Sequence, residues 1–233
     1  MKLLALDAAT TACSVACWSG GAVIAQREET ADRRQAEILM PMVQSTMREA
    51  GFDYHMLDLI AVTTGPGSFT GVRIGLATAR GLALASGLPL TGITTLQALA
   101  AAPPPDERRG GLILAVLDAR RDQLYGQFFD KKGEAASEPF AAAAAAIPGR
   151  YENISPGAAS LLLVGSGAGL AARALDESRH PYHYSESPPF PSAATIAALV
   201  AARGFVPAAN TPVAPFYLRE PGVTPAATDR ERV

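Results

Sequence analysis

Two kinds of hydrophobic pattern alternate along the first hundred residues. Short apolar runs of the kind that form strands occur at 3–7, 14–18, 23–28, 59–64 and 90–93. Between them, apolar residues spaced i, i+3, i+4 predict helices over 34–50 and 70–86, which Gly51 and Gly87 should end. Thr94 and Gln97 have the spacing of a capping box and predict a further short helix. The predicted order is β-β-β-α-β-α-β-α.

Parts of this order recur in the second half of the chain. Residues 3–8 read LLALDA and residues 114–119 read LAVLDA. Likewise, residues 59–67 read LIAVTTGPG and residues 161–169 read LLLVGSGAG, again a buried-type strand that enters a glycine-rich loop. Two matches in the same order and at similar offsets indicate a duplicated unit. We therefore predict an α/β protein of two lobes, each a mixed sheet flanked by helices, as in the duplicated ribonuclease H-like fold of the actin-like ATPases.

The proline and glycine residues suggest where the lobes divide. A proline-rich and charged stretch from 103 to 111 is the predicted linker. It separates a first lobe, residues 1–102, from a smaller second lobe, residues 111–205. We expect residues 206–220 to return to the first lobe and residues 221–233 to form a disordered tail. The alanine run at 141–146 is interpreted as a surface turn of helix or a connector.

Composition indicates an ordinary globular protein, with 48% hydrophobic and 18% charged residues and a net charge of −2. The longest apolar stretch, 71–90, contains Arg73 and Arg80 and does not suit a bilayer, so we expect a cytoplasmic protein without membrane contact. Cys13 and Cys17 lie about 13 Å apart if extended, which predicts reduced core thiols. The paired arginines are scattered, which favours solvated surface charge and leaves open their convergence in space.

The sharpest motif is the loop at 65–75, GPGSFTGVRIG. Ser68 or Thr70 can cap the following helix, whose first amide groups would attract an anion; equally, the loop can join strand to helix and bind nothing. Asp7, at the end of the first strand, either contacts a nucleotide weakly or forms a hydrogen-bonded turn. The candidate nucleotide- or anion-binding residues are Asp7, Thr10, Thr11, Gly65, Gly67, Ser68, Thr70, Gly71 and Arg73.

Together with four other segments, this loop resembles the TsaB (YeaZ) family. The segments are 6–16 (LDAATTACSVA), 39–43 (LMPMV), 117–120 (LDAR) and 215–219 (PFYLR). The resemblance implies a non-catalytic scaffold subunit for N6-threonylcarbamoyladenosine synthesis at position 37 of tRNA. Its implied partners are a TsaD-like catalytic paralogue and a TsaE-like ATPase, with tRNA bound only through the complex and a homodimer formed when the chain is alone.

The resemblance also implies that the helices 34–50 and 70–86 form the partner surface. The candidate interface residues are Leu39, Met42, Val43, Met47, Gly75, Ala79 and Ala83. Small side chains allow a second helix to approach closely, and methionines suit an exchangeable contact. The same small residues are equally suited to packing on the chain's own sheet.

No catalytic or metal-binding residue is expected. The resemblance implies that the catalytic paralogue binds its metal through two histidines four residues apart on the first helix, where this chain has Gln35 and Leu39. No intrinsic cofactor is expected either, and ATP or ADP is considered only at the partner interface. The alternative is an enzyme, either an actin-like small-molecule kinase or a metallopeptidase-like protein. The turns after Asp7 and Asp118 lack glycine, which argues against the kinase.

Overall fold

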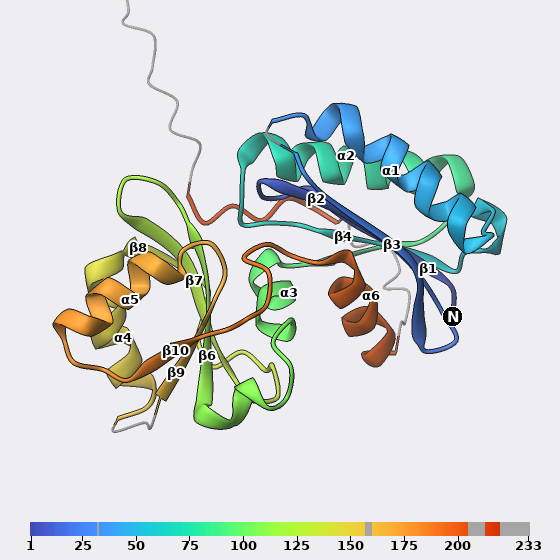
Figure 1. Cartoon of the computed structure of the whole chain (residues 1–233). Coiled ribbons are helices and arrows are strands. Elements are labelled where there is room, and N and C mark those ends of the chain that lie inside the picture. The colour runs from blue at the N-terminus through green and yellow to red at the C-terminus, as the bar shows by residue number, and fades with distance from the viewer. Residues whose placement is uncertain (32, 157–159, 205–212, 220–233) are drawn as a thin grey trace, which may run out of the picture.

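Two five-stranded sheets form the framework of the protein (Figure 1). The computed structural model describes residues 1–31, 33–156, 160–204 and 213–219. The first sheet contains β1 (Leu3–Asp7), β2 (Ala12–Ser19), β3 (Ala22–Thr30), β4 (Leu59–Thr63) and β5 (Leu90–Ile93), in the order β3-β2-β1-β4-β5. The second sheet contains β6 (Gly111–Asp118), β7 (Gln123–Asp130), β8 (Phe140–Ala143), β9 (Ser160–Val164) and β10 (Tyr182–Tyr184).

The second sheet repeats the topology of the first. Its order is β8-β7-β6-β9-β10, so each strand has an equivalent five strands earlier in the chain. In both sheets the first three strands are antiparallel and the last two run parallel to the first. The predicted duplication and the predicted two-lobed α/β fold class are therefore confirmed.

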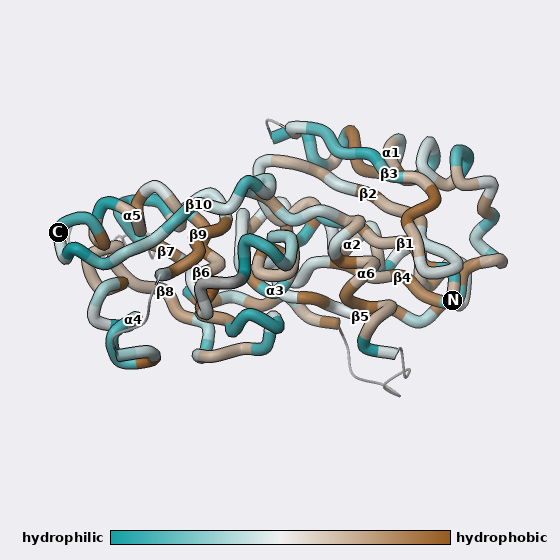
Figure 2. Tube along the Cα trace, turned by 60° about the horizontal axis from the view of Figure 1, so that its bottom comes forward, coloured by the Kyte–Doolittle hydropathy of each residue, from teal (hydrophilic) through white to brown (hydrophobic). Residues whose placement is uncertain are grey.

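Each sheet has two helices on its outer face. α1 (Gln35–Ala50) and α2 (Phe69–Ser86) cover the first sheet, while α4 (Ile147–Ile154) and α5 (Ala168–Glu177) cover the second. Both α1 and α2 end at the predicted glycines, which have φ of 66° at Gly51 and 69° at Gly87. Figure 2 shows that β9 in the second lobe is brown, the colour of hydrophobic residues.

The inner face of each sheet is covered by a helix from the other half of the sequence. α3 (Thr95–Ala101), which begins with the predicted Thr94–Gln97 capping box, packs Leu96 and Leu99 against the second sheet. α6 (Ala193–Ala202) packs Ile196 against the first sheet, and α3 and α6 contact each other between the lobes (Figure 1). The predicted boundary of the second lobe at residue 205 is therefore wrong, because α6 already belongs to the first lobe.

Two other features of the second half complete the comparison with the sequence. The alanine run is divided between a strand and a turn. Residues 140–143 pair with β7 as strand β8, and the 3-10 turn η3 (Ala144–Ala146) follows, so the predicted surface turn of helix describes only the second part of the run. The linker carries a second 3-10 turn, η2 (Glu107–Gly110); a third, η1 (Tyr54–Met56), precedes β4. The predicted tail at 221–233 and the start of the returning segment, 206–212, lie outside the described residues.

The thiols lie in the core of the first lobe. Cys13 and Cys17 are free and buried in β2, and burial raises the pKa of both to about 12. Among the described residues, no helix combines the length and the apolarity that a membrane-spanning segment requires.

Residues 213–219 form a strap that crosses from the first lobe to the second. The Phe216 amide donates to the Thr64 carbonyl oxygen at 2.8 Å, and Val213 packs in the core of the first lobe. At the other end, Leu218 packs against the core of the second lobe. Gly65 leaves room for the strap, since a Cβ there would lie 2.7 Å from the Phe216 carbonyl oxygen. The strap thus ties the two sheets together beyond the linker.

Replacing Arg80 by alanine should loosen this strap. Arg80 Nε donates to the Val213 carbonyl oxygen at 3.2 Å, so the variant is expected to lose about 1 kcal/mol of stability and to exchange the Phe216 amide hydrogen faster. Hydrogen exchange followed by mass spectrometry of peptides covering 213–219 measures the effect. Arg173→Ala on α5, whose Nε bonds within its own helix, is the control. Unchanged exchange in Arg80→Ala would show that the strap is held by other contacts.

Candidate functional site in the cleft between the lobes

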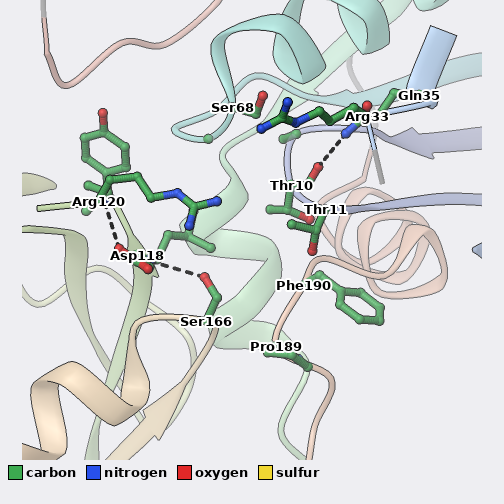
Figure 3. A pocket seen from close by; sticks show the side chains of 15 residues that line it. Thr10, Thr11, Arg33, Gln35, Ser68, Asp118, Arg120, Ser166, Pro189 and Phe190 are labelled. Carbon is green, nitrogen blue, oxygen red and sulfur yellow. Dashed lines mark hydrogen bonds between the residues drawn. The ribbon is translucent and has the colours of Figure 1, made fainter. Parts of the chain in front are cut away.

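A cavity of about 680 Å³ lies between the two lobes (Figure 3). The first lobe contributes the turn after β1, the start of α1 and the loop before α2. The second lobe contributes the end of β6 and the turn that follows it, and the segment before α6 contributes Pro189 and Phe190. The lining residues are Ala9, Thr10, Thr11, Arg33, Gln35, Gly67, Ser68, Leu117, Asp118, Ala119, Arg120, Tyr125, Ser166, Pro189 and Phe190. A volume of this size suits a small-molecule ligand.

Each lobe borders the cavity with a turn of the same kind, in which an aspartate carboxylate accepts a hydrogen bond from the backbone. Asp7 Oδ1 accepts a hydrogen bond from the Ala9 amide at 3.2 Å, and Asp118 Oδ1 accepts one from the Arg120 amide at 2.7 Å. Each aspartate thus bonds the backbone two residues further along, as in an Asx turn. The structure supports the turn-forming interpretation of Asp7, and these two amides are already engaged by the chain itself.

Asp7 is fully buried and does not line the cavity. The Thr63 hydroxyl donates to Asp7 Oδ1, whereas Oδ2 has no partner among the described residues. Burial, with a smaller contribution from the nearby Glu28 carboxylate, raises the pKa of Asp7 to about 7 although the hydrogen bonds from Thr63 and Ala9 oppose the shift. Asp7 is therefore a structural carboxyl group beneath the site.

The glycine-rich loop packs directly on the turn after β1. The Ser68 amide donates to the Ala9 carbonyl oxygen at 2.7 Å, and Ser68 Oγ caps α2 by accepting from the Gly71 amide at 3.3 Å. A Cβ at Gly67 or at Gly71 would lie only 2.2 Å from a carbonyl oxygen of this turn, that of Ala9 or that of Ala8. These two glycines permit close packing, and the Gly71 and Val72 amides at the start of α2 are bonded to Ser68.

The nine predicted anion-binding residues therefore divide into two groups. Thr10, Thr11, Gly67 and Ser68 line the cavity. The other five do not; they are Asp7, Gly65, Thr70, Gly71 and Arg73.

Arg73 lies in a different environment from the one predicted. Its guanidinium carbon lies 3.7 Å from the centroid of the Phe69 ring, and its Nε donates to the Tyr217 hydroxyl at 3.2 Å. Phe69 and Tyr217 also contact each other, with ring centroids 5.6 Å apart. Arg73 thus holds the strap against α2 and does not reach the cavity.

The predicted partner residues mostly face the chain's own core. Leu39, Met42, Val43 and Met47 pack in the core between α1 and the first sheet, and none is more than 6% exposed. The small residues of α2 behave alike, because Gly75 and Ala79 are buried and Ala83 is half-buried. The prediction that these side chains present a surface to a partner is wrong for the six that are buried. The small residues instead allow α2 to lie close to the turn after β1.

Among the lining residues that the sequence analysis did not assign to a site are both arginines of the cavity, Arg33 and Arg120. They approach it from opposite lobes (Figure 3). Each belongs to an arginine pair that was interpreted as solvated surface charge, with convergence left open. The signal in the sequence was the position of Arg120 directly after the LDA repeat, whereas nothing in the sequence placed Arg33 opposite it.

The polar groups of the cavity include several hydrogen-bond donors. Gln35 stands where the resemblance implies a histidine. Its Nε2 donates a hydrogen bond to the Thr10 carbonyl oxygen at 3.1 Å. Within the part of the chain that the structure describes, no three His, Cys, Asp or Glu side chains converge to hold a metal ion. The free donors at the cavity are guanidinium and hydroxyl groups.

Comparisons with known proteins agree with this geometry. The family model described as TsaD, tRNA N6-adenosine threonylcarbamoyltransferase, matches residues 23–176. The tRNA threonylcarbamoyladenosine biosynthesis protein TsaB of Escherichia coli is 42% identical over 127 residues, which is 54% of this chain and 53% of that protein. The chain thus spans about half the length of the curated relatives it matches.

Solved structures extend the similarity to most of the chain. YeaZ from Pseudomonas aeruginosa has a TM-score of 0.73 and 31% identity, over 93% of this chain and 99% of that one. EutJ, an ethanolamine utilization protein from Carboxydothermus hydrogenoformans, shares the fold with a TM-score of 0.52 and 13% identity, over 85% of this chain and 89% of that one. The duplicated sheets and the cleft between them define a two-lobed protein of the actin-like ATPase fold. Within that class, the chain belongs to the TsaB (YeaZ) family.

Proposed function

We propose that this chain is a non-catalytic scaffold subunit in the synthesis of N6-threonylcarbamoyladenosine at position 37 of tRNA. One observation carries the proposal. The chain matches the family model of the transferase over residues 23–176, yet its first helix places Gln35 and Leu39 where the resemblance implies a metal-binding histidine pair. Gln35 is bonded to the Thr10 carbonyl oxygen and Leu39 is buried in the core, so neither offers a metal ligand.

The proposal assigns this chain a TsaD-like catalytic paralogue as its partner. The partner would contact the exposed sides of α1 and α2, which lie next to each other over the first sheet (Figure 1). Leu84 on α2 is 87% exposed, and Ala77 and Gly81 precede it on the exposed part of the same helix. An exposed leucine beside small residues suits the close approach of another helix. When the paralogue is missing, the same surface would pair two copies of this chain.

The remaining partners follow from the same proposal. A TsaE-like ATPase would join the two paralogues, and tRNA would be bound by the complex and not by this chain alone. ATP or ADP is assigned to the contact between the chains. The modest net charge of −2 supports a shared tRNA surface, because a protein that grips a polyanion alone usually has a strongly basic face.

Deleting the gene for this chain should abolish threonylcarbamoyladenosine in bulk tRNA, as measured by mass spectrometry of digested nucleosides. Adding back the chain should restore the nucleoside only in the presence of the paralogue. The purified chain alone should not form the modified base. Formation of the base by the isolated chain, or an unchanged nucleoside content after deletion, would contradict the proposal.

Leu84→Glu is expected to weaken pairing with the paralogue at least tenfold, because a carboxylate would have to be desolvated at the contact. Size-exclusion chromatography with light scattering of the mixture measures the complex. Tyr184→Glu, an equally drastic change at a 53% exposed residue of the second lobe, is the matched control. Substitutions at Val43 or Ala79 would not test the surface, since both side chains are fully buried and a charge there would unfold the lobe. Normal pairing of Leu84→Glu would move the contact elsewhere.

A further inference from the structure

An exposed patch of two aromatic rings and two guanidinium groups lies where the strap crosses the start of α2. We call it the strap patch; it consists of Phe69 and Arg73 on α2 and of Tyr217 and Arg219 on the strap, and all four side chains are exposed. Phe69 is 42% exposed and Tyr217 is 37% exposed. In Figure 1 the strap leads from the first lobe to the second. Apolar side chains that are exposed as a group commonly mark a contact surface.

Contacts among these side chains fix the positions of the rings. The Arg73 guanidinium carbon lies 3.7 Å from the centroid of the Phe69 ring, and Arg73 Nε donates to the Tyr217 hydroxyl at 3.2 Å. The planes of the two rings differ by 31°. Further along the strap, Arg219 Nη1 donates to the Ala119 carbonyl oxygen at 3.5 Å. The patch is therefore largely ordered before any partner binds, which lowers the entropic cost of binding.

The patch is positively charged in a chain that is negative overall. The sequence has 22 acidic and 20 basic residues, yet residues 69–86 and 213–219 contain no aspartate or glutamate and three arginines, Arg73, Arg80 and Arg219. The ion pairs found among the described residues involve other side chains. A local surface of this sign attracts a polyanion.

The combination of exposed rings and arginines is typical of surfaces that bind single-stranded nucleic acid. Unpaired bases stack on aromatic rings and on guanidinium planes, while arginines also contact the phosphates between the bases. A double helix would offer phosphates but no free base faces to Phe69 and Tyr217. An apolar protein partner would use the rings but not the positive charge.

We propose that the strap patch binds unpaired nucleotides of the tRNA, with at least one base stacked on Phe69 or Tyr217 and a neighbouring phosphate bound by Arg219. The inference rests on the proposed function, because that function supplies the RNA. It adds a surface of this chain to the tRNA contacts of the complex. The patch is small, which agrees with RNA binding that is shared with a partner.

The position of the patch allows the paralogue and the RNA to bind at the same time. Phe69 begins α2, and Leu84, which is assigned to the contact with the paralogue, lies fifteen residues further along the same helix. At 1.5 Å per residue, the two side chains are separated by about 22 Å along the helix axis. A tRNA on the strap patch would therefore lie beside the paralogue and not beneath it.

The affinity of the assembled complex for an unmodified tRNA transcript tests the proposal, measured by fluorescence anisotropy. Phe69→Leu should weaken binding about fivefold or more, because leucine keeps the apolar bulk but offers no ring for a base. Phe69→Tyr keeps the ring and should remain within about twofold of the unchanged complex. The matched control is Tyr184→Leu, which removes a 53% exposed ring from the second lobe and should have no effect.

Arg219→Gln provides a second variant that does not alter the rings. It should weaken binding about threefold or more and reduce the dependence of the affinity on salt by about one phosphate contact. Arg173→Gln, at an exposed arginine of α5, should leave both the affinity and the salt dependence unchanged. Urea unfolding followed by Trp18 fluorescence shows whether each variant is folded. Should Phe69→Leu fail to fold, the salt dependence of Arg219→Gln still decides.

Cross-linking identifies the RNA contact directly. A transcript with 4-thiouridine in place of uridine, irradiated in the complex, should cross-link to a peptide that contains Phe69 or Tyr217. The inference is overturned if folded Phe69→Leu and Arg219→Gln bind tRNA normally, if Phe69→Tyr loses as much affinity as Phe69→Leu, or if the variants lose a protein partner in light scattering instead of tRNA.

Failure of the proposed function would give a different result. In that case the unchanged chain would not pair with the paralogue, or the assembled complex would not form the modified nucleoside. If pairing and nucleoside formation are both observed while the patch variants bind tRNA normally, only the assignment of the strap patch is wrong.

Discussion

Gly71→Ala is expected to lower the free energy of unfolding by about 3 kcal/mol or more. The added methyl group would lie 2.2 Å from the Ala8 carbonyl oxygen, and this neighbour is backbone that cannot rotate away. Either α2 moves away from the turn after β1 or the turn itself shifts. Both changes disturb the hydrogen bond between the Ser68 amide and the Ala9 carbonyl oxygen. Since typical domains are stable by only 5–15 kcal/mol, part of the variant should be unfolded at physiological temperature.

The same substitution ten residues further along the helix should have the opposite effect. Gly81 lies in α2, and a Cβ there would have no neighbour within 4 Å. Gly81→Ala is therefore expected to stabilise the chain by about 0.5–1 kcal/mol, because alanine loses less backbone entropy in a helix. The two variants differ only in what the added methyl group meets, which makes Gly81→Ala the control for Gly71→Ala.

Trp18 provides the measurement. It is the single tryptophan of the sequence and packs against the core on the inner face of the first sheet, so its fluorescence during urea unfolding reports on the lobe that contains α2. A midpoint for Gly71→Ala equal to that of the unchanged chain would mean that the loop does not pack on the turn as closely as the structure indicates. It would also restore the interpretation of this loop as an open anion site.

The repeat was predictable from sequence because a strand end followed by a turn has a local signature. LLALDA and LAVLDA place equivalent aspartates at the ends of β1 and β6, and the structure gives both the same amide contact. The Thr94–Gln97 capping box is likewise local, since its two hydrogen bonds join residues three apart. Signals of this kind survive in a single sequence because every participating group is close in the chain.

The wrong predictions concern choices between surfaces that look alike in sequence. The apolar positions of α1 and the small residues of α2 suit a partner helix and the chain's own sheet equally well. Only the structure shows that they pack against the chain's own sheet. α6 is rich in alanine and apolar on most sides, so its sequence did not show which sheet it covers. The residues that the first lobe contributes to the cleft were predicted in part. The positions of Arg33 and Arg120 on opposite sides of it were not, because they depend on how the two lobes are joined.

The alanine run shows the limit of propensity. Residues 141–143 lie in a strand although alanine favours helices, because their backbone groups complete the edge of the second sheet against β7. In the first lobe the equivalent strand, β3, is longer and carries charged residues on its exposed face. Pairing with an existing strand outweighs the intrinsic preference of the run, and this is a tertiary effect that no local pattern encodes.

Asp7→Asn is expected to change how stability depends on pH. The folded-state pKa of Asp7, about 7, lies above the value of 3.8 for an unperturbed aspartate. Between these values the folded chain keeps a proton on Asp7 that the unfolded chain has released. The free energy of unfolding therefore falls as pH rises, by up to about 1.4 kcal/mol per pH unit from this group, and levels off above the folded-state pKa.

The asparagine side chain can accept the bonds from Thr63 and Ala9 and has no charge to bury, so this contribution to the slope should vanish. Relative to the unchanged chain, Asp7→Asn should gain about 3 kcal/mol between pH 5 and pH 8, read from urea midpoints at each pH with Trp18 fluorescence. Asp118→Asn, at the equivalent but exposed turn of the second lobe, should not reproduce the gain. Parallel pH profiles for the unchanged chain and Asp7→Asn would show that the Asp7 carboxyl group keeps its charge despite burial. Burial also raises the pKa of Glu28, so this carboxyl group would then contribute to any remaining slope.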